Sequence, residues 1–193
     1  GPTAEVAHHV ERTGASLEGA RVAGSPAEVA RAADVVVICV TASDDVERVV
    51  DEARIAMCAE AVGAMDESLK TTVEYLKTRK QFGVAIGTFQ TLQHRAADMF
   101  VALEQARSMS MFATMAADFE SATDRATAVA AAKVQIGKSG KFIGQQSIQL
   151  HGGIGMTQEA KIGHYFKRLT MIENTFGDTD YHLRRVTDAG GLV

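Results

Sequence analysis

The chain has 193 residues, of which 46% are hydrophobic and 23% are charged, and its formal net charge is −4. This composition predicts a soluble globular protein of one domain or two small ones, and the negative charge argues against nucleic-acid binding. No apolar run reaches the roughly 18 residues of a membrane-spanning helix, so we expect no membrane partner. Without a recognisable signal peptide, and with two cysteines that lack metal-ligand spacing, we expect a cytoplasmic protein with buried reduced thiols and no metal site.

The N-terminal part of the chain has the pattern of a βαβ unit. Residues 20–23 predict a short strand, and Ser25 and Pro26 predict the N-cap and first position of a helix. Residues 34–40 are apolar without polar alternation after Asp34, which is typical of a parallel strand covered on both faces. A second helix follows, so the order is strand, helix, strand, helix.

Residues 19–28 and 33–40 resemble an interior part of the Rossmann domain of 3-hydroxyisobutyrate dehydrogenase-type enzymes. That family's glycine-rich phosphate turn would lie upstream, and no G-x-G-x-x-G motif occurs before residue 50. Without this turn, no helix N-terminus is supplied to a dinucleotide pyrophosphate, so we expect no NAD(P) cofactor. Two strands make a poor sheet alone, and we expect dimerisation to complete it.

From residue 51 onwards the sequence predicts an up-down four-helix bundle, so the fold class is mostly α with a small N-terminal βαβ segment. The expected helices cover residues 51–80, 91–119, 123–150 and 158–174, with a short last helix over 180–188. In the first helix, apolar residues recur every four positions from Met57 through Ala61, Met65 and Leu69 to Val73. This helix is either separate from the one before it or continuous with it. We assign residues 1–50 and 51–193 to two domains.

The connection between the first two helices combines cations with glycines and aromatic residues. Lys77, Arg79 and Lys80 lie at the C-terminal end of the first helix, where they complement its dipole. The alternative is an anion site, because the planar guanidinium of Arg79 suits a phosphate group. The glycine loop over residues 151–157 also leaves two interpretations, a plain turn or a phosphate cradle made of backbone N–H groups.

These two segments carry a family resemblance. RKQFG at residues 79–83 and IGTFQ at 86–90 resemble the RxxFG…(I/L)xxFQ signature of acyl-CoA dehydrogenases, and QLHGGIG at 149–155 continues it. The resemblance covers about residues 53–190, the C-terminal helical domain of that family. It implies a flavoprotein oxidoreductase of fatty-acid metabolism, in which a carboxylate removes the α-proton of an acyl-CoA and FAD accepts the hydride. The sequence does not reveal the acyl substrate.

In this family FAD lies between subunits, so the resemblance implies residues that reach the cofactor of a neighbouring chain. The expected contacts are Arg79, Gln81 and Phe82 at the pyrophosphate and adenosine side, Gln149, Gly152 and Gly153 at the adenine end, and Thr179 near the flavin.

Both positions that the family uses for its catalytic glutamate lack one here. They align with Gly177, in the turn FGDT at residues 176–179, and with Ala53. Asp178 is the nearest acid, and it is either a substitute base or the N-cap of the last helix. The ending from residue 176 to 185 resembles the small subunits of bacterial heteromeric acyl-CoA dehydrogenases, in which a partner acyl-CoA dehydrogenase subunit is able to supply the base.

A complete family member also has an N-terminal helical domain and a middle β-domain, and neither fits within 193 residues. One hypothesis is therefore an acyl-CoA dehydrogenase subunit or fragment that is inactive alone. The alternative is a chimera, a self-associating domain that joins two truncated enzyme fragments and has no activity. Both predict a homo-oligomer, a dimer or tetramer, because a lone copy of this bundle would expose apolar helix faces.

Three side chains on the expected helices complete the predictions. Glu60 lies in an apolar stretch and is expected to be buried beside Arg95 or Lys133. His164 and His182 lie beside aromatic residues and are expected to be packed and hydrogen-bonded rather than catalytic.

Overall fold

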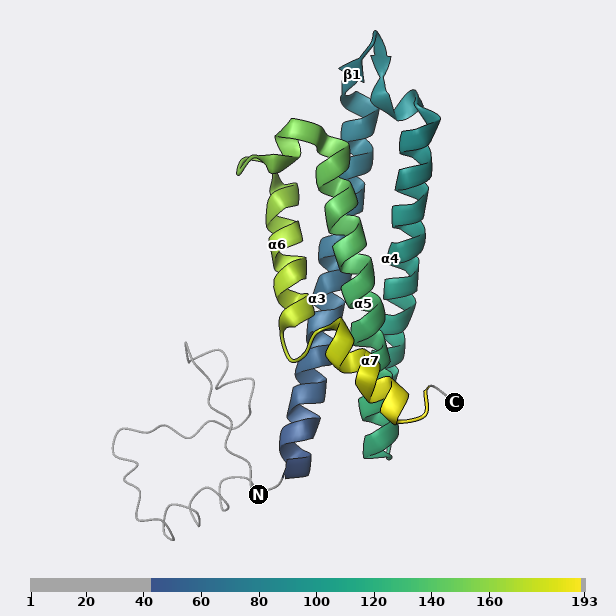
Figure 1. Cartoon of the computed structure of the whole chain (residues 1–193), viewed down its shortest axis with the longest axis vertical. Coiled ribbons are helices and arrows are strands. Elements are labelled where there is room, and N and C mark those ends of the chain that lie inside the picture. The colour runs from purple at the N-terminus through teal and green to yellow at the C-terminus, as the bar shows by residue number, and fades with distance from the viewer. Residues whose placement is uncertain (1–42, 192–193) are drawn as a thin grey trace, which may run out of the picture. The chain divides into compact units, whose positions relative to one another are not determined.

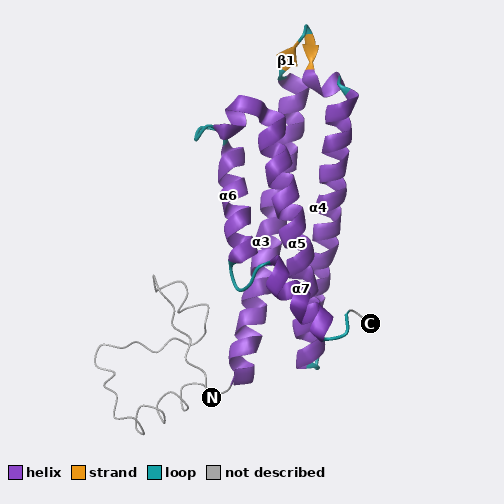
Figure 2. Ribbon diagram, viewed as in Figure 1, coloured by secondary structure: helices purple, strands orange, loops and turns teal. Residues whose placement is uncertain are grey.

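The computed structural model describes residues 43–191. The strands expected at residues 20–23 and 34–40 lie outside this range, together with the resemblance to 3-hydroxyisobutyrate dehydrogenases that rests on them. Both stay predictions. The described part of the chain is mostly helical, and its two strands form one short hairpin (Figure 2).

Four long helices run up and down beside one another, and a fifth helix lies across one end of the bundle against α5 (Figure 1). They are α3 (Ser43–Thr78), α4 (Gln90–Ala116), α5 (Ala122–His151), α6 (Lys161–Asn174) and α7 (Thr179–Asp188). The predicted up-down four-helix bundle is confirmed. The helix expected from Asp51 is continuous with the one before it, so α3 runs without a break through the expected domain boundary.

The connection between α3 and α4 is more ordered than the predicted loop. It contains β1 (Lys80–Gln81), β2 (Val84–Ala85) and the 3₁₀-helix η1 (Ile86–Thr88). The turn between the strands holds Phe82 and Gly83 at φ of 54° and 83°. A two-residue hairpin turn with both φ values positive matches the twist of its strands, which explains the hairpin, although Phe82 adopts this conformation at a cost.

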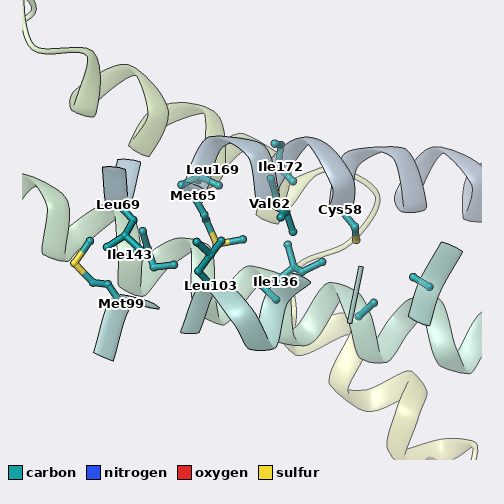
Figure 3. Close-up of a cluster of buried hydrophobic side chains, with 14 of the residues drawn as sticks. Cys58, Val62, Met65, Leu69, Met99, Leu103, Ile136, Ile143, Leu169 and Ile172 are labelled. Carbon is teal, nitrogen blue, oxygen red and sulfur yellow. The ribbon is translucent and has the colours of Figure 1, made fainter. Parts of the chain in front are cut away.

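In α3 the core follows the predicted helical stripe, with Met65 and Leu69 buried (Figure 3). Its labelled side chains are Cys58, Val62, Met65 and Leu69 from α3, Met99 and Leu103 from α4, Ile136 and Ile143 from α5, and Leu169 and Ile172 from α6. Helix α5 packs against all the other long helices. Burial raises the pKa of the Cys58 thiol to about 11, so this cysteine is a packed, protonated side chain, as expected.

Glycines allow α6 to approach α5 closely. A β-carbon placed at Gly144 would lie 2.5 Å from the ring of Phe166, and one at Gly140 would lie 3.4 Å from Leu169. These contacts leave little or no room for a larger side chain, so α6 settles directly on the backbone of α5.

Two sequence predictions about side chains are wrong. Glu60 is exposed instead of buried, and it binds Arg168 on α6 through two hydrogen bonds of 2.5 and 2.7 Å. His164 is exposed rather than packed, although its Nε2 atom lies 3.0 Å from the carbonyl oxygen of Gln158. Both residues lie on helix faces that adjacent apolar residues suggested would be buried, and the rotation of each helix turns them outward. None of the helices in the described part of the chain is long and apolar enough to cross a membrane.

Candidate functional site

The hairpin after α3 places Arg79 beside the end of the bundle. The backbone N–H of Arg79 donates to the carbonyl of Tyr75, and its carbonyl accepts from Ile86, so Arg79 is fixed between α3 and η1. Lys77, one of the three clustered cations, forms an ion pair of 2.7 Å with Glu74. In the described part of the chain, Arg79 has no ion-pair partner within 4.0 Å, so its guanidinium is available to an anion.

A second backbone feature lies at the same end of the bundle, where α5 turns toward α6 (Figure 1). Helix α5 stops at Gly152, whose φ is 61° and ψ −140°, a conformation that favours glycine. The 3₁₀-helix η2 (Gly152–Met156) follows, where the sequence predicted a loop. A β-carbon at Gly155 would lie 2.7 Å from the carbonyl oxygen of Ile148, so the turn folds back tightly onto α5.

The hairpin and this turn together line an open hollow of about 380 Å³. Its lining residues are Tyr75, Arg79, Gln81, Ile86, Gln149, Leu150, His151, Gly152, Gly153 and Ile154. Five of the seven expected cofactor-binding residues therefore lie around one hollow: Arg79, Gln81, Gln149, Gly152 and Gly153. The hollow offers a guanidinium, two side-chain amides and glycine backbone, which are groups that suit a phosphate and a polar nucleoside.

Phe82 does not line this hollow. It is 91% exposed at the tip of the hairpin, where its ring meets that of Phe89 edge-on at 6.1 Å. A large aromatic side chain held outward in a strained backbone conformation is more consistent with a contact to another molecule than with a role within this chain.

The two remaining predicted residues, Asp178 and Thr179, lie at the other end of the bundle. The side chain of Asp178 accepts a hydrogen bond of 2.8 Å from the backbone N–H of Tyr181, so Asp178 is the N-cap of α7. Thr179 packs against Gly137 of α5, because a β-carbon at Gly137 would lie 2.5 Å from its hydroxyl oxygen. Gly137 and Gln149 are twelve residues apart on α5, which corresponds to about 18 Å along a helix. The hollow and the α6–α7 turn are therefore two separate sites.

Buried donors from three helices hold the turn between α6 and α7. Nζ of Lys133 donates to the carbonyl oxygens of Ile172, Glu173 and Thr175 at 2.6, 3.2 and 3.0 Å. The carbonyl of Phe176 accepts from Arg54 at 3.0 and 3.1 Å, and His182 Nε2 lies 3.1 Å from the same oxygen.

The backbone and the titration behaviour of this turn are unusual. Phe176 has a φ of 58°, in the left-handed region that non-glycine residues rarely adopt. Burial, with smaller effects of Arg54 and Lys133, lowers the pKa of His182 to about 4. Burial also lowers the pKa of Lys133. His182 is therefore neutral near pH 7 and acts as a hydrogen-bond donor to the turn rather than as a cation. Among the described residues, no cluster of His, Cys, Asp and Glu is arranged to hold a metal ion.

Comparison with protein families decides what this arrangement belongs to. The family model for the acyl-CoA dehydrogenase C-terminal domain matches residues 44–190. The match covers most of the chain and spans both the hollow and the α6–α7 turn. The chain belongs to the acyl-CoA dehydrogenase family.

Individual members of the acyl-CoA dehydrogenase family agree with this assignment. The acyl-CoA dehydrogenase IpdE2 of Mycolicibacterium smegmatis is 35% identical over 156 residues, which are 81% of this chain and 48% of IpdE2. A variant of the steroid ACAD Tcur3481-Tcur3483 superposes with a TM-score of 0.68 at 34% identity, over 72% of this chain and 38% of that one. The FAD complex of PigA superposes with a TM-score of 0.63 at 32% identity, over 70% and 35%. The chain thus spans about half or less of the length of these relatives.

Sequence reasoning missed several residues of this acyl-CoA dehydrogenase domain. Tyr75 lines the hollow and was not expected there, and the side chain of His151 was given no role although it belongs to the predicted glycine loop. The buried Arg54 and Lys133 were not assigned to the α6–α7 turn. The signal available for Lys133 was a single cation in an alanine-rich stretch of a helix. Such a position requires a partner, but the sequence alone does not show that the partner is the C-terminal end of another helix.

Proposed function

We propose that this chain contributes one part of an FAD site in an acyl-CoA dehydrogenase assembly, which removes two hydrogens from the Cα–Cβ bond of an acyl-CoA. The observation that carries the proposal is the hollow between the hairpin and η2. Arg79 and Gln149 are 70 positions apart in the sequence, yet they line the same hollow, together with the glycine backbone of the turn. Two segments far apart in the sequence have thus been brought together at one hollow.

The residues of the hollow fit the phosphate and adenosine part of FAD. No other atom lies within 4 Å of the place a β-carbon would take at Gly152 or Gly153, so these glycines leave open space beside the hollow. A ligand is thus able to approach the backbone there. Arg79 would pair with the pyrophosphate through its planar guanidinium, while Gln81 and Gln149 would orient the nucleoside. The flavin, when bound, supplies the acceptor of the substrate hydride.

The α6–α7 turn has a different role in the proposal. Thr179 is distant from the hollow of its own chain. It would therefore lie near the flavin of a second FAD molecule, which another subunit holds in part. Asp178 serves as the cap of α7, and Gly177 and Ala53 offer no carboxylate. A partner subunit would therefore supply the base that removes the α-proton. One similar solved structure, at 25% identity and a TM-score of 0.64, is the ChsE4-ChsE5 complex of Mycobacterium tuberculosis.

An oligomer is expected from the surface of α4. Phe100, Val101, Met111 and Met115 on this helix are each more than half exposed, at 55, 53, 63 and 62%. Exposed apolar side chains concentrated on one helix are typical of an interface. We infer that the chain forms a dimer or tetramer, or joins a partner acyl-CoA dehydrogenase subunit, through surfaces of this kind.

A titration of the purified chain with FAD, followed by flavin fluorescence and combined with its mass in solution, tests the proposal. We expect an oligomer that binds FAD saturably at micromolar concentration. Arg79→Ala should weaken binding by about 10-fold or more, the effect of losing a charge-assisted hydrogen bond worth ~1.5–3 kcal/mol. Lys77→Ala is the matched control, because Lys77 is a neighbouring cation that pairs with Glu74 and does not line the hollow.

The second candidate is a self-associating domain without catalytic activity. It would be favoured by a stable oligomer that binds no FAD up to millimolar concentration, because the family residues would then serve only the fold. The chimeric form of this candidate rests on the resemblance of residues 19–50 to a Rossmann domain, most of which precedes the family match from residue 44.

A further inference from the structure

His151 is held rigidly at the edge of the hollow. It is the last residue of α5, its side chain is buried, and its ring stacks on Tyr75 of α3 with 4.4 Å between ring centroids and an angle of 24°. Both rings line the hollow. Because two different helices fix this pair, the imidazole has little freedom to turn.

A hydrogen bond determines which ring nitrogen carries the proton. Nδ1 of His151 lies 2.8 Å from the carbonyl oxygen of Ser147. A carbonyl oxygen only accepts, so Nδ1 must donate. In the neutral ring Nε2 is then an unprotonated acceptor. No described group donates to Nε2, and Nε2 is not one of the polar atoms sealed from solvent without a partner.

An acceptor at this place has a specific consequence for the ligand. The guanidinium of Arg79 and the N–H groups of the glycine turn are donors, and they suit phosphate oxygens. A phosphate near pH 7 offers His151 no donor in return, whereas a nucleoside offers an exocyclic amine on the base and hydroxyl groups on the ribose. The acceptor is therefore matched to the nucleoside and not to the phosphates.

We propose that His151 is a specificity-determining residue of the hollow, whose Nε2 accepts a hydrogen bond from the adenine amine or a ribose hydroxyl of the bound nucleotide. The proposal rests on the proposed function, since it presumes that the hollow binds an adenine nucleotide. A site whose acceptor atom takes a hydrogen bond from the ligand binds an analogue without that donor more weakly, because the acceptor atom of the protein is then left unpaired.

The test compares three nucleotides on the full chain by competition with FAD. ADP carries both kinds of donor, IDP replaces the amine with oxygen, and 2′,3′-dideoxyADP lacks both ribose hydroxyls. We expect the wild-type chain to bind ADP about 10-fold or more tightly than one of the two analogues. His151→Phe keeps a ring to stack on Tyr75 but has no acceptor, so it should bind ADP as weakly as the wild type binds that analogue and should lose the preference. His94→Phe replaces an exposed histidine that does not line the hollow, and it should keep the preference.

Each result decides a different claim. If the wild type binds all three nucleotides alike, or if His151→Phe retains the preference, the role of His151 is overturned while the FAD site stands. If the wild type binds neither FAD nor ADP, the proposed function fails first. The wild-type comparison needs no variant, so equal binding of the three nucleotides overturns the role of His151 even if His151→Phe does not fold.

Discussion

Asp178 lies one position after the place where the family motif has its catalytic glutamate, and it also has a structural role of its own. The sequence left it as a substitute base or as a helix cap, and the structure places its carboxylate on the backbone N–H of Tyr181. The cap is confirmed, and the catalytic role stays an untested prediction. An N-cap side chain contributes about 1 kcal/mol, typically, to stability.

Substitution separates these two roles, because Asn caps a helix about as well as Asp but cannot take up a proton as a carboxylate does. We expect Asp178→Asn to leave the free energy of unfolding in urea unchanged, and Asp178→Ala to lower it by about 1 kcal/mol. In an assembly that dehydrogenates acyl-CoA, Asp178→Asn should retain activity. Loss of activity with unchanged stability would instead identify Asp178 as the base.

At the scale of the element, η2 and the end of α5 depend on glycines for different reasons. At Gly155 a β-carbon would lie 2.7 Å from a backbone oxygen of Ile148, which cannot move without opening the turn. At Gly153 nothing lies within 4 Å of that position. The first glycine is needed for the turn to close, and the second leaves room for a ligand.

These two glycines form a matched pair of variants. Gly155→Ala should lower the melting temperature by several degrees. The added methyl group must displace the backbone, and this is comparable to overpacking a core, which lowers the free energy of unfolding by about 1–3 kcal/mol. Gly153→Ala should leave the melting temperature unchanged but weaken FAD binding, because its methyl group enters the approach to the hollow. Equal FAD affinity for Gly153→Ala and the wild type would show that the ligand does not approach this part of the turn.

The α6–α7 connection depends on residues that are distant from it in the sequence. Its carbonyl oxygens point at Lys133 of α5 and Arg54 of α3, and its backbone is strained at Phe176. Buried ammonium and guanidinium groups need acceptors, and the end of a helix has carbonyls without partners. Hydrogen bonds from Lys133 and Arg54 to these carbonyl oxygens satisfy both kinds of group, and they hold the turn in place although it has no regular secondary structure.

At the scale of the whole molecule, the pH dependence of folding should show the burial of His182. Its pKa falls from 6.5 to about 4 on folding, mainly through desolvation. The folded state therefore favours the neutral ring, and the unfolded chain takes up a proton first as the pH falls. The stability from this group is fully present above pH 6.5 and is lost as the pH falls through about 4.

Urea unfolding at pH 7 and pH 4 measures this effect. Between these values the wild type should lose about 3 kcal/mol through His182, since one pKa unit corresponds to about 1.4 kcal/mol. The loss of unfolding free energy should be about 3 kcal/mol smaller for His182→Gln than for the wild type, because glutamine does not titrate. The other titrating groups contribute equally to both proteins. The exposed His94 provides the control, and His94→Gln should follow the wild type. An identical pH dependence for His182→Gln and the wild type would contradict the burial of a neutral ring.

The sequence alone determined the features that depend on local pattern. Apolar residues at helical spacing predicted the long helices and their buried faces, and short connections predicted the up-down order. The cap was one of the two roles that the sequence offered for Asp178, because capping involves adjacent residues. The motif segments at 79–83 and 149–155 were also visible in the sequence. Each of these signals is contained within a few turns of one helix or one connection.

Only the tertiary structure decided which of these segments meet. It brought Arg79 to Gln149 around one hollow and left Thr179 about 18 Å away along α5. It also turned Glu60 outward and Lys133 inward. The physical reason is that burial and proximity depend on how each helix is rotated and how closely its neighbours approach. Packing against distant segments sets both of these, and the local pattern of a helix carries no record of them.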